Sequence, residues 1–294
     1  MNYWFGPLSG WLPNRWWAGR PDLAFVWNGI KQRYLPSVRL LRELGAHVVY
    51  VEHGWYPQQA TVQLDDVGVN IGASWANKPL AANGQTPLQV RDKGDLLLLL
   101  QYDRDTQLTD YSPWFRDMAA LVDHVTKHSA LRVRVRPHPR HPPAAGLKEL
   151  VLSRGHLWDD SSTLQQALSA SRALACINSS TAIEALNQRL PVLCFGESVY
   201  RHPGAVYCLD NQAAQLQAVT TELSRGQCSL FVEPITAVLQ RVAANQFTVE
   251  QLHQRLPSMI DTWLGIARQQ NVAPYQVRSF PALPFAGGLT RATV

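Results

Sequence analysis

The sequence predicts an α/β fold in which two Rossmann-like domains face a cleft and helices close the chain. The length of 294 residues is about twice that of a typical domain of ~150 residues. Short apolar runs alternate with segments of helical spacing, which is the βαβ signature of parallel sheets. Unusual polar motifs follow several predicted strands, at the carboxyl ends where such sheets bind ligands. We therefore expect a ligand-handling enzyme.

The first domain is predicted to cover residues 1–110 and to contain one helix and three strands. The strands are expected at residues 23–27, 47–51 and 95–100. Apolar residues at helical spacing predict a helix over residues 34–44. Gly45 is expected to end it, because glycine adopts the left-handed backbone conformation of a helix C-cap.

The second domain is predicted to cover residues 111–245 and to repeat this alternation. Ser112 and Pro113 are expected to open a helix over residues 114–128, as N-cap and first helical residue. Further strands are expected at 131–135, 173–177, 191–195 and 206–209, and further helices at 162–171, 180–188, 213–224 and 235–244. Residues 246–294 are expected to form a helix at 249–269 and an irregular tail, packed back on the first domain.

Composition excludes several classes of protein. Hydrophobic residues make up 46% of the chain and charged residues 17%, which excludes disorder and coiled coil. No apolar run approaches the ~18 residues of a membrane span, and residues 1–19 lack the order of a secretory signal. The four cysteines lie far apart without CxxC spacing, so buried free thiols in a reducing cytosol are expected rather than a zinc site.

The net charge of +5 indicates an anionic partner. Arg132, Arg134, Arg136 and Arg140 alternate with apolar residues along one predicted strand and its end. That spacing places them on one face, where they suit a compact anionic ligand better than a long duplex. Since no zinc-finger, RNA-recognition or basic-zipper signature is present, nucleic acid is not an expected partner.

Two motifs in the second half predict a phosphate site. Residues 178–181 (NSST) follow a strand and open a helix, so free backbone N–H groups and hydroxyls would meet there. The plain alternative is a helix N-cap. Glu184, on the same helix, would either complement the helix dipole or hold a ribose or base edge.

Residues 136–139 (RPHP) hold His138 between two prolines, which restrict the backbone and orient the imidazole. The alternative is a proline-rich surface turn with incidental histidines, of which His141 is one. Together with the NSST motif, His138 is interpreted as a second phosphate ligand, whose imidazolium would help a phosphate to depart.

Carboxylates at two strand ends are candidate catalytic groups. Glu52 ends one strand, and Asp103-Arg104-Asp105 follows another after Gln101. The Asp-x-Asp spacing also occurs in metal-nucleotide motifs, and ordinary surface turns would explain both sites equally well. Two carboxylates at one cleft are what glycosyl transfer uses, one as nucleophile and the other for proton transfer. The ten tryptophans suit sugar stacking or a hydrophobic core, and the sequence singles out none of them.

The ordered set of motifs resembles the capsule polysaccharide biosynthesis family of bacterial transferases of 3-deoxy-manno-octulosonic acid (Kdo). The matching segments are 52–55 (EHGW), 98–107 (LLLQYDRDTQ), 136–139 (RPHP), 177–186 (INSSTAIEAL), Pro191-Val192, Gly196 and Tyr200. The family often has Glu-Asp-Gly-Phe at the first segment and Lys before His-Pro at the third. The resemblance implies a GT-B fold and a CMP-Kdo donor.

The resemblance also implies roles for individual residues. Asp105, four residues after Gln101, would be the nucleophile of a retaining β-Kdo transferase, and Glu52 the acid/base. His138 would bind the CMP phosphate and assist its departure. The remaining donor-binding residues would be Gln101, Arg136, Asn178, Ser179, Ser180, Thr181 and Glu184.

The predicted function is transfer of Kdo from CMP-Kdo to a lipopolysaccharide or capsule glycan, with retention and without a metal or other cofactor. The acceptor would be a glycan or glycolipid, reached at the cytoplasmic face of the inner membrane by peripheral association. Two alternatives stay open. One is a sialyltransferase-like enzyme that uses another CMP-activated acid, and the other is an inactive GT-B module that binds sugar or assists assembly.

Overall fold

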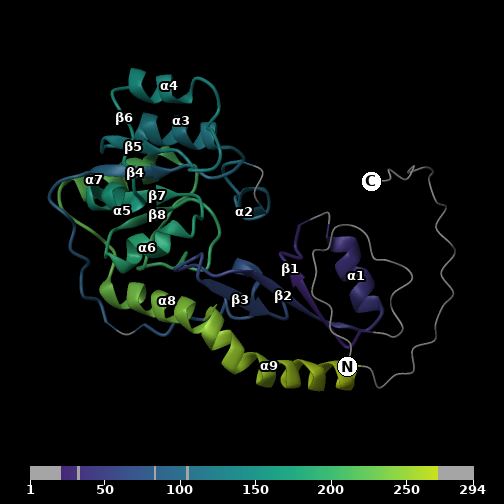
Figure 1. Cartoon of the computed structure of the whole chain (residues 1–294). Coiled ribbons are helices and arrows are strands. Elements are labelled where there is room, and N and C mark those ends of the chain that lie inside the picture. The colour runs from purple at the N-terminus through teal and green to yellow at the C-terminus, as the bar shows by residue number, and fades with distance from the viewer. Residues whose placement is uncertain (1–20, 32–33, 83, 104–105, 271–294) are drawn as a thin grey trace, which may run out of the picture.

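The computed structural model describes residues 21–31, 34–82, 84–103 and 106–270, which form two sheets flanked by helices (Figure 1). The first part of the chain comprises β1 (Leu23–Trp27), α1 (Leu35–Glu43), β2 (His47–His53), β3 (Thr61–Asp65), η1 (Asn70–Gly72), β4 (Asp95–Leu99), α2 (Thr106–Thr109) and α3 (Met118–His128). The central part comprises β5 (Val133–Arg136), α4 (Leu147–Ser153), β6 (Leu157–Trp158), α5 (Leu164–Ser169), β7 (Ser171–Cys176), α6 (Thr181–Asn187), β8 (Val192–Cys194) and β9 (Tyr207–Cys208). The last part comprises α7 (Ala213–Ser224), α8 (Val232–Ala244), β10 (Phe247–Thr248) and α9 (Val249–Gln270).

The larger sheet has six strands in the order β6-β5-β4-β7-β8-β9, and every pair of neighbours is parallel. Helices α3 and α6 lie on opposite sides of it (Figure 1). All five residues of β4 are buried, as expected for a leucine-rich strand covered on both faces. This sheet confirms the predicted parallel α/β domain.

The boundary between the two domains differs from the predicted one at residue 110. Strand β4, which that boundary assigns to the first domain, pairs with β5 and β7 in the larger sheet. The physical reason is burial: a continuous apolar strand belongs at the centre of a parallel sheet. The larger domain therefore begins before Asp95.

The smaller sheet has the order β1-β2-β3-β10 and is mixed. Strands β1 and β2 are parallel and connected through α1, whereas β3 is antiparallel to both β2 and β10. The first domain is thus Rossmann-like only in its β1-α1-β2 unit. Strand β3 was not expected from the sequence.

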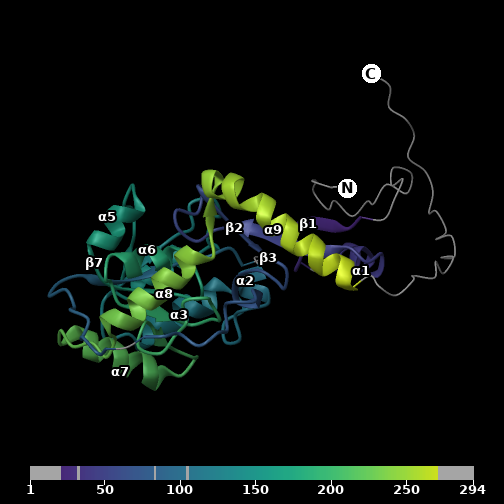
Figure 2. The ribbon, with the colours of Figure 1, turned by 90° about the horizontal axis from the view of Figure 1, so that it is seen from below.

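Helices cover both faces of the smaller sheet. Val38 and Leu41 of α1 pack against one face, with Ala24, Val26 and Val48. Trp263 and Leu264 of α9 pack against the other face, with Leu23, Phe25 and Val49. The rings of Phe25 and Trp263 meet edge to face at 5.9 Å. Figure 2 shows α9 leaving the larger domain and running along the smaller sheet.

Helix α3 begins later than the sequence suggests. Its N-cap is Asp117, whose side chain accepts the N–H of Ala120 at 2.8 Å. The predicted cap, Ser112, donates its hydroxyl to the carbonyl of Phe115 instead. Both residue types are good N-caps, and Asp117 supplies the hydrogen bond that a cap requires.

The cysteines are free thiols, as expected. Cys176 and Cys194 are buried, while Cys208 and Cys228 are partly exposed. No helix in the described part of the chain combines the length and the apolar character needed to cross a membrane.

Candidate functional site

A cavity of about 860 Å³ lies between the two domains, at the carboxyl ends of β1 and β2 on one side and of β4, β5 and β7 on the other. It gathers eight of the ten residues predicted for the site. These are Glu52, Gln101, Arg136, His138, Asn178, Ser179, Ser180 and Thr181. Asp105 lies outside the described residues, and Glu184 does not line the cavity.

The cavity wall carries more basic than acidic side chains. Lys31, Arg136 and Arg140 line it, with three histidines. Within the described lining Glu52 is the one acidic residue. This balance favours an anionic ligand.

The NSST segment forms the cavity wall after β7. The hydroxyl of Tyr200 donates to the carbonyl of Ser179 at 2.8 Å, and Ser179 Oγ accepts the N–H of Thr181 at 3.3 Å. Ser180 occupies the N-cap position of α6 without capping it through its side chain. Burial raises the pKa of the Tyr200 phenol well above its usual range, so the phenol stays a hydrogen-bond donor. Tyr200 thereby fixes the backbone from which the three hydroxyls project.

Gln101 and Asn178 bind each other across the ends of β4 and β7. Gln101 Nε2 donates to Asn178 Oδ1 at 2.9 Å, and the Asn178 backbone N–H donates to Gln101 Oε1 at 3.1 Å. Asn178 Nδ2 also donates to the carbonyl of Glu197 at 3.3 Å. Both side chains line the cavity. These bonds occupy several of the hydrogen-bonding atoms of their amide groups and connect the ends of β4 and β7 in the cavity wall.

His138 is oriented by the turn that contains it. The backbone N–H of Arg140 donates to His138 Nδ1 at 3.2 Å. Because Nδ1 acts as the acceptor, the proton of this imidazole is placed on Nε2.

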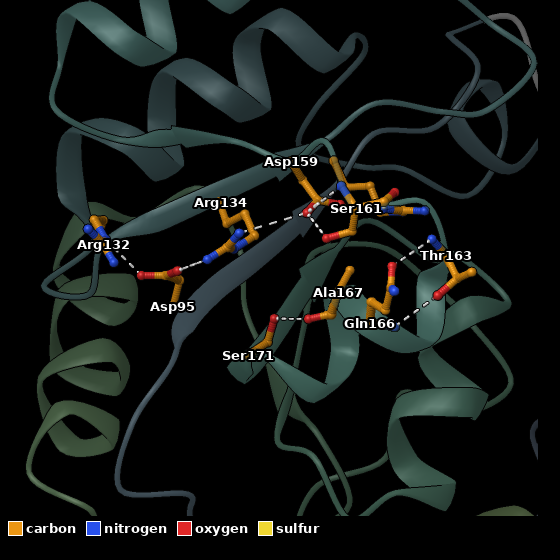
Figure 3. A network of polar contacts seen from close by, with 10 residues as sticks. Asp95, Arg132, Arg134, Asp159, Ser161, Thr163, Gln166, Ala167 and Ser171 are labelled. Carbon is orange, nitrogen blue, oxygen red and sulfur yellow. Dashed lines mark hydrogen bonds and ion pairs between the residues drawn. The ribbon is translucent and has the colours of Figure 1, made fainter.

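The arginines of β5 do not form a free anion-binding row as predicted. Figure 3 shows Arg132 and Arg134 at the carboxylate of Asp95, with Arg132 Nε 2.8 Å and Arg134 Nη2 2.6 Å from it. Arg136 contacts the buried carboxylate of Asp159 and donates to the carbonyl of Ser161 at 3.1 Å.

The physical reason is the cost of burying charge. Asp159 has a fully buried side chain and Asp95 is 7% exposed, so each carboxylate needs cationic partners. Of the four arginines, only Arg136 and Arg140 line the cavity.

Glu52 is held at the opposite wall by two donors. Asn28 Nδ2 donates to Glu52 Oε2, and the backbone N–H of His53 donates to Oε1 at 2.9 Å. Asn28 has a φ of 50°, a left-handed conformation that asparagine adopts more readily than most residues. The turn after β1 therefore places an amide against the carboxylate at the end of β2.

Gln246 supports the loop that follows Glu52. Its Oε1 accepts the N–H groups of Trp55 at 2.8 Å and Tyr56 at 3.1 Å. Gly54 has no room for a side chain, because a Cβ would lie 2.2 Å from Thr61 Oγ1. Sequence reasoning missed Gln246, since nothing in the chain links it to a loop 190 residues away.

Asp103 and Glu184 lie apart from the cavity wall. Asp103 Oδ1 accepts the N–H of Met118 at 2.8 Å, which supports the start of α3. Glu184 lies in the first turn of α6, where burial raises the pKa of its carboxyl. The described residues contain no group of three His, Cys, Asp or Glu side chains arranged to hold a metal ion.

The fold defines a two-domain α/β protein with a cavity between its domains. Residues 49–231, more than half of the chain, match the family model described as capsule polysaccharide biosynthesis protein. The chain therefore belongs to the capsule polysaccharide biosynthesis protein family. This agrees with the resemblance carried by the motifs.

One curated protein and two solved structures are also similar to the chain. Protein FixF of Sinorhizobium fredii is 26% identical over 210 residues, which are 60% of this chain and 49% of FixF. The chain thus spans about half the length of this relative. A structure titled Thermosulfurimonas dismutans KpsC, beta Kdo 2,7 transferase, is 16% identical, with a TM-score of 0.48, over 76% of this chain and 86% of the other. One titled beta Kdo 2,4 transferase of the same protein is 12% identical, with a TM-score of 0.44, over 83% and 87%.

Proposed function

We propose that the chain is a glycosyltransferase that moves Kdo from CMP-Kdo to a glycan or glycolipid acceptor, with retention of configuration. The observation that carries this is the composition of the cavity. A carboxylate held by two donors, Glu52, stands on one domain, and hydroxyl, imidazole and guanidinium groups stand on the other. Hydrogen-bond donors and cations suit the anionic leaving group of the sugar donor, and a carboxylate suits removal of the proton from the acceptor hydroxyl.

The phosphate of CMP would lie against the hydroxyls of Ser179, Ser180 and Thr181 and the Nε2–H of His138. Ser180→Ala and His138→Ala should each raise the donor KM roughly ten- to hundredfold, because each removes a hydrogen bond to a charged group worth about 1.5–3 kcal/mol. Ser258→Ala and His253→Ala, at exposed positions on α9, are matched controls. Near-normal kinetics in both cavity variants would remove the phosphate assignment.

The transfer is proposed to proceed by double displacement. The Asp105 carboxylate attacks the anomeric carbon and the bond to the CMP oxygen breaks, so CMP leaves. An acceptor hydroxyl then attacks the same carbon while Glu52 takes its proton, which releases Asp105. The assignment of Asp105 rests on its spacing from Gln101 and on the motif resemblance.

Intact-mass spectrometry tests this step directly. Wild-type protein with CMP-Kdo and no acceptor should gain one Kdo-sized adduct, which maps to the peptide that contains Asp105. Asp105→Asn should abolish the adduct and lower transfer by several orders of magnitude while CMP still binds. An adduct on Asp103, full activity of Asp105→Asn or an inverted linkage would each refute the mechanism.

The reaction is proposed to need no divalent metal. CMP-Kdo carries one phosphate rather than a diphosphate, and the hydrogen-bond donors of the cavity suffice to balance its charge. If a chelator abolishes turnover and manganese restores it, a metal held by the Asp-x-Asp motif replaces this proposal.

One assay separates the proposed donor from the alternatives. Purified protein is incubated with CMP-Kdo or CMP-sialic acid, with and without acceptor glycan, and released CMP is measured. Release from CMP-Kdo alone supports the proposal, and release from CMP-sialic acid alone favours the sialyltransferase alternative. No release from either donor favours a binding or assembly module.

A further inference from the structure

Three aromatic rings from two strand-end loops form a column in the cavity wall. The ring of Tyr102, after β4, stacks on the ring of His141 with centroids 4.0 Å apart and planes at 16°. His141 in turn lies against His138, with centroids 4.7 Å apart and planes at 34°. All three residues line the cavity. The proposed donor contacts assign no task to Tyr102 or His141.

The backbone fixes only part of the His138 side chain. Arg140 N–H meets Nδ1 at 3.2 Å, and His141 N–H meets the His138 carbonyl at 3.3 Å, which closes the turn. These backbone bonds act on Nδ1 and on the carbonyl of His138, whereas a ring contact acts on the face of the imidazole. His141 packs on that ring, and Tyr102 stacks on His141.

We propose that His141 and Tyr102 are positioning residues for His138, and that the column sets the direction in which His138 Nε2–H points. This inference rests on the proposed function, in which His138 binds the donor phosphate. The column joins the loop after β4 to the loop after β5, so the imidazole is held from a second strand. A hydrogen bond to an anion requires such alignment, because it weakens steeply as the donor angle closes.

Single substitutions separate stacking from other roles. His141→Ala and Tyr102→Ala should each raise the donor KM about three- to tenfold, the size expected for loss of one aromatic contact. His141→Phe and Tyr102→Phe keep a ring face, and they should stay within about twofold of wild type by the same reasoning. His253→Ala, exposed on α9, serves as the histidine control. Failure of the phenylalanine variants to restore the donor KM would overturn the stacking role.

A double-mutant cycle tests whether His141 acts through His138. If it does, His141→Ala has no further effect on donor KM in a His138→Ala background. Additive losses would mean that His141 contacts the donor itself, and would overturn the positioning role. If the His141 variants fail to fold, the same cycle is run with Tyr102→Ala and His138→Ala. Tyr102 lies on the other loop and is 37% exposed, so its truncation disturbs the fold less.

A spectroscopic measurement separates failure of this proposal from failure of the proposed function. The NMR resonance of His138 Hε1 should shift in His141→Ala, because the ring current of the stacked imidazole is lost, and Tyr102→Ala should shift that of His141. This readout needs no turnover. An unchanged His138 resonance would refute the column, whereas absent CMP release by wild type would refute the donor assignment and leave the column standing.

Discussion

Asn178→Ala should both destabilise the protein and impair donor use. Asn178 is 6% exposed, and its side chain accepts from Gln101 Nε2 at 2.9 Å and donates to the carbonyl of Glu197 at 3.3 Å. Truncation leaves both partners without these bonds in a partly buried setting. We expect a loss of about 2–4 kcal/mol in the free energy of unfolding.

The functional effect follows from the position of Asn178 in the chain. Ser179 and Ser180 come directly after it, so a loosened Asn178 displaces the hydroxyls proposed to bind phosphate. The donor KM should rise roughly tenfold at a temperature where the variant is fully folded. Asn178→Asp should be worse for the donor than Asn178→Ala, because it adds a negative charge beside an anion site.

Urea unfolding followed by circular dichroism measures the stability, and CMP release at varied CMP-Kdo concentration measures the donor KM. Asn187→Ala is the matched control, since Asn187 lies on α6, is exposed and donates only to the carbonyl of Ile183 in its own helix. Equal unfolding midpoints for Asn178→Ala and Asn187→Ala would refute the idea that the Gln101–Asn178 hydrogen bonds stabilise the cavity wall.

Asp103→Asn should cost about 1 kcal/mol of stability by weakening the bond to Met118 N–H; CMP release should stay near wild type, and a large loss there would contradict the structural role of Asp103. Trp27→Ala should raise the acceptor KM and spare the donor KM, because its indole is 44% exposed at the cavity wall and offers an apolar face to a sugar ring; equal changes in both constants would argue against this. Iodoacetamide should label Cys176 and Cys194 slowly in native protein, since burial raises the pKa of Cys176 to about 11 and that of Cys194 as well; rapid labelling seen by mass spectrometry would be inconsistent with these buried thiols.

The sequence predicts a strand well where its buried residues are apolar. It fails where the buried residues of the strand are polar. Strand β3 is an example: its buried positions are Thr61, Gln63 and Asp65, while Val62 and Leu64 are partly exposed. A hydrophobic pattern cannot reveal such a strand. Asp65 is buried because it accepts hydrogen bonds from the loop at 67–74, a partnership visible only in three dimensions.

For the site, the sequence predicts which residues line one cavity, but it does not predict the side chains with which they pair. Strand-end motifs converge because parallel strands share one carboxyl edge, and this places His138 and Ser180 together at the edge of the larger sheet, while Glu52 faces the same cavity from the end of β2 in the smaller sheet. The pairing of Arg136 with Asp159 depends instead on the unexpected two-residue strand β6, which brings Asp159 beside β5. Such long-range ion pairs have no signature in local spacing.

The return of the chain to the smaller sheet constrains how the cavity opens. The polypeptide passes between the sheets twice, within residues 66–94 and again at Asn245 and Gln246, before β10 joins β3. Two chain segments therefore connect the domains. A pair of connections limits relative rotation of the domains to an axis near both segments, whereas a single linker would allow rotation about many axes. Gln246, at one crossing, accepts the N–H groups of Trp55 and Tyr56, so this connection is hydrogen-bonded to the loop that follows Glu52.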